Sequence, residues 1–93
     1  MTAKKKLQEN IIEIGKIIKS HRKSLTTKNT SRDYFISDRI SMGLLPDGWI
    51  SEKTLSNIEN GRNLPSLITL KKLSIALEID FIDLVKEIEK YLY

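Results

Sequence analysis

The chain has 93 residues, so we expect one domain with a modest core and no deep cleft between two lobes. Lysine and arginine together number 16 against 12 acidic residues, and the resulting net charge of +4 suits a polyanionic partner. The absence of cysteine excludes disulfides, thiolate catalysis and cysteine-based zinc sites, and a single histidine excludes a histidine metal cluster.

The remaining exclusions concern membranes and catalysis. No apolar run reaches the roughly 20 residues that span a bilayer, and no apolar signal-peptide core follows the basic start, so we expect a cytoplasmic protein without a membrane partner. No carboxylate pair, serine–histidine combination or glycine-rich phosphate loop has the spacing for catalysis. The sequence predicts neither an enzyme nor a cofactor.

The first predicted element is an amphipathic helix over about residues 6–23. Its apolar residues recur three and four positions apart, and its other face carries Lys16, Lys19 and Lys23. Residues 1–6, which include three consecutive lysines, are interpreted as a basic tail, with an arm reaching toward DNA as the alternative. The polar residues 24–30 compete with helical backbone bonding and predict a loop.

A second helix is predicted from Ser31, its N-cap, to Met42, with Gly43 ending it. The following segment, residues 43–49, contains Pro-Asp-Gly, which favours a tight turn and stops a helix. We expect its large apolar residues to cover the core, because such residues rarely stay exposed together. The alternative is a surface for a partner.

Residues 51–60 predict a short helix with both ends encoded. Ser51 is a good N-cap, and Gly61 stands where helices commonly end in a left-handed residue. Only Leu55 and Ile58 are strongly apolar, three residues apart and therefore on one face. Polar side chains are expected to point largely outward: Glu52, Lys53, Thr54, Ser56, Asn57 and Asn60.

Two further helices complete the predicted fold. Ser66 caps a fourth helix with apolar residues from Leu67 to Leu77, and Asp80 caps a fifth that runs to the C-terminus. Five helices without a strand pattern predict an all-α domain. The end of the last helix, within residues 81–93, carries apolar residues beyond what the core requires, and predicts a self-association surface: Ile88, Tyr91, Leu92 and Tyr93.

The polar residues of the third helix have the chemistry for reading bases in the major groove. Lys53 suits guanine O6 and N7, Asn57 suits adenine, Glu52 accepts from cytosine N4, and the Thr54 methyl suits a thymine methyl. Phosphate contacts are expected from hydroxyls, amides and arginines near helix ends. The candidates are Ser31, Arg32, Ser51, Asn60 and Arg62. The alternative for the whole face is a solvated surface.

Residues 50–84 resemble the second half of the phage-repressor/Cro-like (lambda-repressor-like) helix-turn-helix domain. The resemblance rests on Ile50-Ser51, Leu55-Ser56-x-Ile58-Glu59-x-Gly61-Arg62-x-x-Pro65-Ser66-x-x-Thr69-Leu70, Leu73, Ala76-Leu77 and Phe81-x-x-Leu84. The segment Ile14–Arg22 is similar to the family's first helix in a looser way. The chain departs from the family in a longer loop after Arg22 and in an enlarged turn, residues 43–49, inside the helix-turn-helix of residues 31–60.

The resemblance implies roles for several residues. It implies base contacts at Glu52, Lys53 and Asn57, and phosphate-binding groups on both sides of Gly61. It also implies a largely buried ion pair between Arg22 and Glu59, with a structural role.

These patterns predict a sequence-specific regulator of transcription that binds double-stranded DNA, in particular a bacterial or mobile-element repressor that occupies a promoter. A homodimer on a palindromic operator is expected, because one module reads only a few base pairs. The alternatives are an antitoxin-type protein that also binds a protein regulator, and an interaction module that has lost DNA binding.

Overall fold

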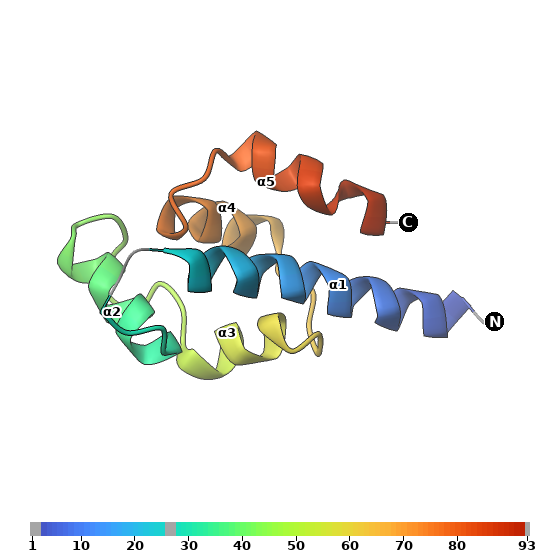
Figure 1. The fold of residues 1–93 in the computed structure, drawn as a ribbon, viewed down its shortest axis with the longest axis horizontal. Helices are drawn as coiled ribbons and strands as arrows, with labels where there is room; N and C mark the ends of the chain where they lie inside the picture. The colour runs from blue at the N-terminus through green and yellow to red at the C-terminus, as the bar shows by residue number, and fades with distance from the viewer. Residues whose placement is uncertain (1–2, 26–27, 93) are drawn as a thin grey trace.

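The computed structural model describes residues 3–25 and 28–92 (Figure 1). Within these ranges the chain forms five α-helices and one 3-10 helix, and no strand. The elements are α1 (Ala3–Ser24), α2 (Arg32–Ser41), α3 (Glu52–Glu59), α4 (Leu67–Ala76), α5 (Phe81–Ile88) and η1 (Glu89–Tyr91). The predicted all-α, five-helix fold is therefore confirmed.

Local sequence signals set most helix ends. Ser31, Ser51 and Ser66 each accept a hydrogen bond from the backbone N–H three residues further on, at 3.0–3.2 Å. Asp80 caps α5 in the same way through two N–H groups. Gly61 has a φ of 73°, the left-handed conformation that ends a helix at low cost. Each of these ends satisfies backbone groups that a helix leaves open.

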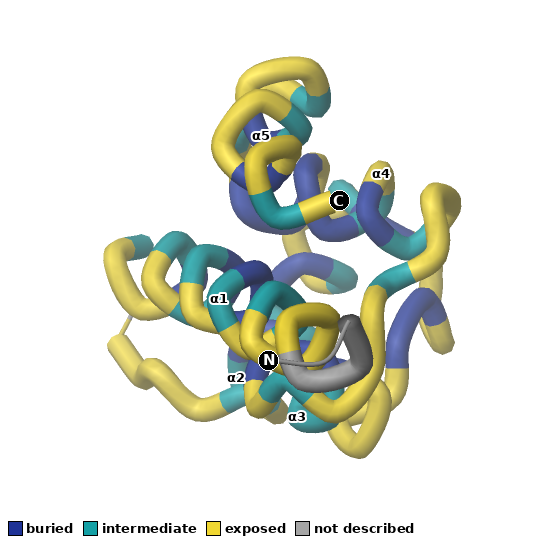
Figure 2. The backbone as a smooth tube through the Cα atoms, turned by 90° about the vertical axis from the view of Figure 1, so that its right-hand side faces the viewer, coloured by how far each residue is buried: buried dark blue, intermediate teal, exposed yellow. Residues whose placement is uncertain are grey.

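Helix α1 forms the centre of the fold. Helices α2 and α3 lie on one side of it, and α4 and α5 lie on the other (Figures 1 and 2). The core fills the space between these layers. Helices α1, α3, α4 and α5 supply buried aliphatic side chains, and α2 supplies the buried Phe35 with Ile36 and Ile40 partly buried beside it. Among the described residues, seven apolar side chains are at most 1% exposed: Ile14, Ile18, Leu55, Leu73, Ala76, Leu84 and Ile88.

The α1–α3 contact is close because a glycine lies in it. A Cβ atom on Gly15 would stand 2.4 Å from the Ile58 carbonyl oxygen and 2.7 Å from that of Glu59. Both neighbours are backbone atoms that cannot move aside independently. Gly15 therefore allows α3 to approach α1 more closely than any other residue would permit.

The segment between α2 and α3 covers one end of the core. Leu45 and Trp49 are buried, and the Trp49 ring meets Phe35 edge-on with centroids 6.1 Å apart. The Trp49 indole N–H donates to the Ile36 carbonyl at 3.4 Å. The backbone N–H of Trp49 donates to the Pro46 carbonyl, which closes the predicted turn. The interpretation of this segment as a cover for the core agrees with these contacts.

The ends of the chain differ from the prediction. Helix α1 starts at Ala3, so the backbone of residues 3–6 is helical instead of forming a tail. Leu7 was placed on the buried stripe but is 56% exposed, because this end of α1 extends beyond the other helices (Figure 1). At the other end, α5 stops at Ile88 and tightens into η1, where a continuous helix had been expected.

Two apolar residues lie in environments that helical spacing does not predict. Ile88 is predicted to be surface for self-association, but it is 1% exposed and belongs to the core. Leu67 keeps the apolar spacing of the fourth helix, but it is 72% exposed at the start of α4. Helical spacing identifies a face, but the positions of the neighbouring helices decide how far along that face burial extends.

Arg39 on α2 is buried, which the sequence pattern does not predict. Its guanidinium donates to the Ala76 carbonyl at 3.0 Å, to Glu78 at 2.9 Å and to the neighbouring Asp38. Burial lowers the pKa of Arg39, but the hydrogen bonds and charges of Asp38 and Glu78 outweigh that effect and raise it above its ordinary value. Arg39 therefore remains charged and links α2 to the end of α4.

Candidate nucleic-acid interface

The outer side of α3 presents polar side chains to solvent, while its inner side is buried. Lys53 and Thr54 are exposed and Asn57 is half-buried. Leu55 and Ile58, on the opposite side, are at most 2% exposed. In Figure 1, α3 lies at the lower edge of the molecule with α1 above it. The predicted base-reading residues are thus held on a helix whose position the core fixes.

A buried ion pair joins α3 to α1. The Arg22 Nε donates to Glu59 Oε2 at 2.6 Å, and its Nη2 donates to Glu59 Oε1 at 2.9 Å. The Glu59 side chain is fully buried and that of Arg22 nearly so. The remaining Arg22 Nη1 donates to the Thr30 carbonyl, which ties the loop before α2 to the same pair. The geometry is the paired-fork arrangement in which arginine and carboxylate bind most strongly.

Arg32, a predicted phosphate contact, also reaches this pair. Its Nε donates to Glu59 Oε1 at 2.9 Å, and its Nη1 lies 3.9 Å from Glu52 Oε1. The Arg32 side chain is 22% exposed, so only part of its guanidinium faces solvent. Arg32 is therefore a partner of two α3 carboxylates as well as a candidate for phosphate.

A polar hollow of about 440 Å³ lies beside this cluster, between the last turns of α1 and the starts of α2 and α3. Its lining includes four cationic residues, Lys19, Arg22, Lys23 and Arg32, against two acidic ones, Asp33 and Glu52. The predicted site did not include Lys19 or Lys23. Their four-residue spacing on the polar face of α1 was the available signal, but only the fold brings that face to the N-terminal end of α3.

At each end of α3, the predicted contact residues form hydrogen bonds with neighbouring side chains. At the C-terminal end, Arg62 Nη1 donates to Asn57 Oδ1 at 3.3 Å. Asn60, which is exposed, donates from Nδ2 to Ser56 Oγ at 3.1 Å. At the N-terminal end, the Ser51 hydroxyl donates to Thr54 Oγ1 at 2.8 Å while it caps the helix.

Ser31 occupies a similar place at the start of α2. Its hydroxyl accepts from the Tyr34 N–H as the α2 cap, and its own N–H donates to Asn29 Oδ1 at 2.7 Å. The hydroxyl lines the polar hollow beside Arg32. Ser31 thus lies in the same hollow as Lys19, Lys23 and Arg32, and its hydroxyl already accepts one hydrogen bond as the α2 cap.

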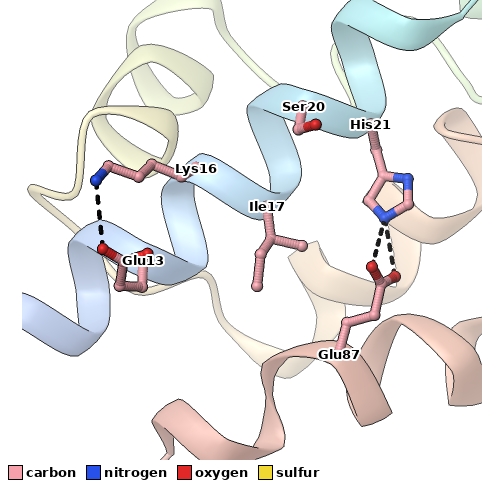
Figure 3. Close-up of a pocket in the computed structure, with 6 residues that line it drawn as sticks. All are labelled: Glu13, Lys16, Ile17, Ser20, His21 and Glu87. Carbon is pink, nitrogen blue, oxygen red and sulfur yellow. Dashed lines mark hydrogen bonds and ion pairs between the residues drawn. The ribbon is translucent and has the colours of Figure 1, made fainter.

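A smaller hollow of about 270 Å³ lies on the other side of α1, facing α5 (Figure 3). There His21 Nε2 lies 2.8 Å from Glu87 Oε2, and Lys16 pairs with Glu13 at 3.3 Å. His21 on α1 thus links that helix to α5. Two carboxylates, Glu13 and Glu87, line this hollow together with one lysine, Lys16, so it does not favour an anion, and we assign it a structural role.

Part of the chain matches a known protein family. Residues 47–84 match the family model described as helix-turn-helix. The match runs from the turn before α3 through α4 to Leu84 in α5 and so includes the whole outer face of α3. No curated protein and no solved structure matched the chain significantly. Among the described residues, no helix is long and apolar enough to cross a membrane.

Proposed function

We propose that this protein is a sequence-specific transcriptional repressor that places α3 in the major groove of operator DNA and blocks a promoter by occupying it. The helix-turn-helix match supports DNA binding and transcription regulation. The observation that carries the proposal is the two-sided character of α3, whose inner side is fixed in the core while its outer side presents donors and acceptors to solvent. A rigid support of this kind is what base reading requires.

In this proposal the middle of α3 reads bases. Lys53 and Asn57 are one helical turn apart on the outer side, a spacing that directs both toward neighbouring base pairs. Lys53 donates to guanine and Asn57 pairs with adenine, while Thr54 contacts a thymine methyl. Because Arg62 holds Asn57 Oδ1 in the free protein, Asn57 exchanges that bond for the adenine amino group on binding.

Phosphates are held at both ends of α3 in this proposal. At its N-terminal end the cationic hollow contributes Lys19, Lys23 and Arg32. At its C-terminal end, Asn60 and Arg62 are exposed on either side of Gly61. Two anchoring points on opposite ends of one short helix fix its register along the groove, which is the role of phosphate contacts in specific recognition. Ser31 and Ser51 add hydroxyls beside the first of these points.

A second copy of the chain is the proposed partner in solution. Exposed apolar side chains surround a hollow of about 190 Å³ beside α5, and they include Leu64, Leu67 and Leu92. A symmetric contact through this surface buries residues that otherwise face water and places two reading helices on one duplex. Half-sites would then lie about one helical turn apart.

Selection of bound sequences from a random duplex pool tests the proposal. We expect a palindrome with half-sites about 10 base pairs apart, and binding that weakens with salt at a log–log slope of about −0.9 per phosphate contacted. A recovered site without symmetry would contradict the dimer alone. No binding to any duplex at low salt would contradict the DNA-binding function itself.

A further inference from the structure

The two arginines that bind Glu59 carry one more positive charge than Glu59 neutralises, and Glu52 is the second carboxylate near them. Two guanidinium groups, Arg22 and Arg32, donate to the single carboxylate of Glu59, which leaves one positive charge in excess. The Arg32 end of this cluster is only 22% exposed, so water screens that charge incompletely. Glu52 supplies the second negative charge, since its Oε1 lies 3.9 Å from Arg32 Nη1.

The helix geometry explains why two carboxylates reach the same arginine. Glu52 and Glu59 are seven residues apart, about two turns of α3, so they lie on the same side of the helix. Glu59 is covered by α1, whereas Glu52, in the first turn, is 47% exposed and lines the cationic hollow. Glu52 thus stands between Arg32 and an approaching phosphate, at the edge of the base-reading face.

We propose that Glu52 is a specificity-determining residue that withholds Arg32 from phosphate until a matching base pair takes its place as the partner of Glu52. This inference rests on the proposed DNA-binding function. A separation of 3.9 Å is too long for a hydrogen bond, so a phosphate oxygen displaces Glu52 from Arg32 at small cost. The released carboxylate then lies against the DNA polyanion. A cytosine N4 amino group in the groove relieves that repulsion, and other bases do not.

The predicted consequence is that Glu52 weakens binding to non-matching DNA more than binding to the operator. Neutralising it with the isosteric Glu52→Gln should tighten binding to random-sequence duplex by about two- to fivefold, the effect of one partly exposed ion pair. The ratio of operator to random affinity should fall by at least that factor, because glutamine also loses the charge-assisted bond to cytosine.

Asp33→Asn provides a matched control. Asp33 is an exposed acid that lines the same hollow, and it lies in the first turn of α2 as Glu52 lies in the first turn of α3. Both variants remove one negative charge from the same region and one favourable interaction with a helix dipole. Only the Glu52 variant removes the pair to Arg32. On random duplex, where Glu52 seldom meets a matching base pair, a difference between the two variants therefore reports on that pair.

The experiment measures the affinities of wild type, Glu52→Gln and Asp33→Asn for the selected operator and for random duplex, with thermal melts to verify folding. We expect the specificity ratio to fall for Glu52→Gln and not for Asp33→Asn. When each is combined with Arg32→Gln, the two variants should change binding to random duplex by the same amount, because the arginine that pairs with Glu52 is then absent. Equal behaviour of the two variants in the presence of Arg32 would overturn the inference while leaving DNA binding intact. A wild-type protein that binds no duplex would instead overturn the proposed function.

Discussion

The inner and outer sides of α3 differ in burial and in their contacts, although the helix has only eight residues. On the inner side, Leu55, Ile58 and Glu59 are buried against α1, and Glu59 is held by two arginines. On the outer side, Lys53 and Asn57 face water and have few protein partners to constrain them. Polarity alone therefore does not identify a candidate base-contacting residue. Glu59 is as polar as Lys53, but it is buried in an ion pair with α1.

The largest expected effect comes from removing the buried carboxylate. Glu59→Ala leaves Arg22 without a buried counter-charge, and we expect a loss of about 3–5 kcal/mol in the free energy of unfolding. Denaturant unfolding measures it, and Arg22→Ala should lose a comparable amount. Glu52→Ala is the control on the exposed end of the same stripe and should change stability by about 1 kcal/mol or less. An equal free energy of unfolding for wild type and Glu59→Ala would contradict a structural role of the Arg22–Glu59 pair.

The next effect tests the close contact that positions the inner side. Gly15→Ala puts a methyl group against the carbonyls of Ile58 and Glu59, so α3 must shift away from α1. We expect a destabilisation of about 1–3 kcal/mol by thermal melting, together with weaker DNA binding as the reading helix moves. Ser20→Ala, at an exposed position of the same helix, should change neither. An unchanged melting temperature for Gly15→Ala would mean that α1 and α3 do not pack as closely at Gly15 as the structure shows.

On the outer side, Asn57→Ala should affect recognition and leave the fold intact. We expect a loss of about 1–3 kcal/mol in binding free energy on the selected operator, with a much smaller loss on random duplex and an unchanged melting temperature. Fluorescence anisotropy with both duplexes measures the difference. A lower melting temperature would show that Asn57 belongs to the structural side.

The smallest effect concerns the boundary between base reading and phosphate binding. Arg62→Ala should weaken binding to all duplexes and reduce the magnitude of the salt slope by about one. Because Arg62 donates to Asn57 Oδ1, the losses in the double variant should not add. Strict additivity would indicate that the Arg62–Asn57 contact has no part in DNA binding.

Prediction from sequence succeeded where the signal was local. Serine caps and the glycine after α3 identified the helices because a cap depends only on residues within one turn. The sequence failed at Arg39, which is buried and donates to the Ala76 carbonyl at the end of α4. It also failed at Ile88, which is buried, and at Leu67, which keeps the apolar spacing of its helix but is exposed. Each failure concerns how far an apolar face is covered, which the spacing of residues along one helix does not encode.

The sequence by itself determined the helical class, the ends of α3 and which of its residues have donors and acceptors for bases. Resemblance to a family suggested the Arg22–Glu59 pair, and the structure brings the two side chains together. The contact of Arg32 with that pair depends on the tertiary structure. The same is true of the hollow beside the pair, which Lys19, Lys23 and Glu52 line. The physical reason is that charges from three helices interact here across chain separations of 27 and 37 residues, and only the packing of α1, α2 and α3 sets those distances.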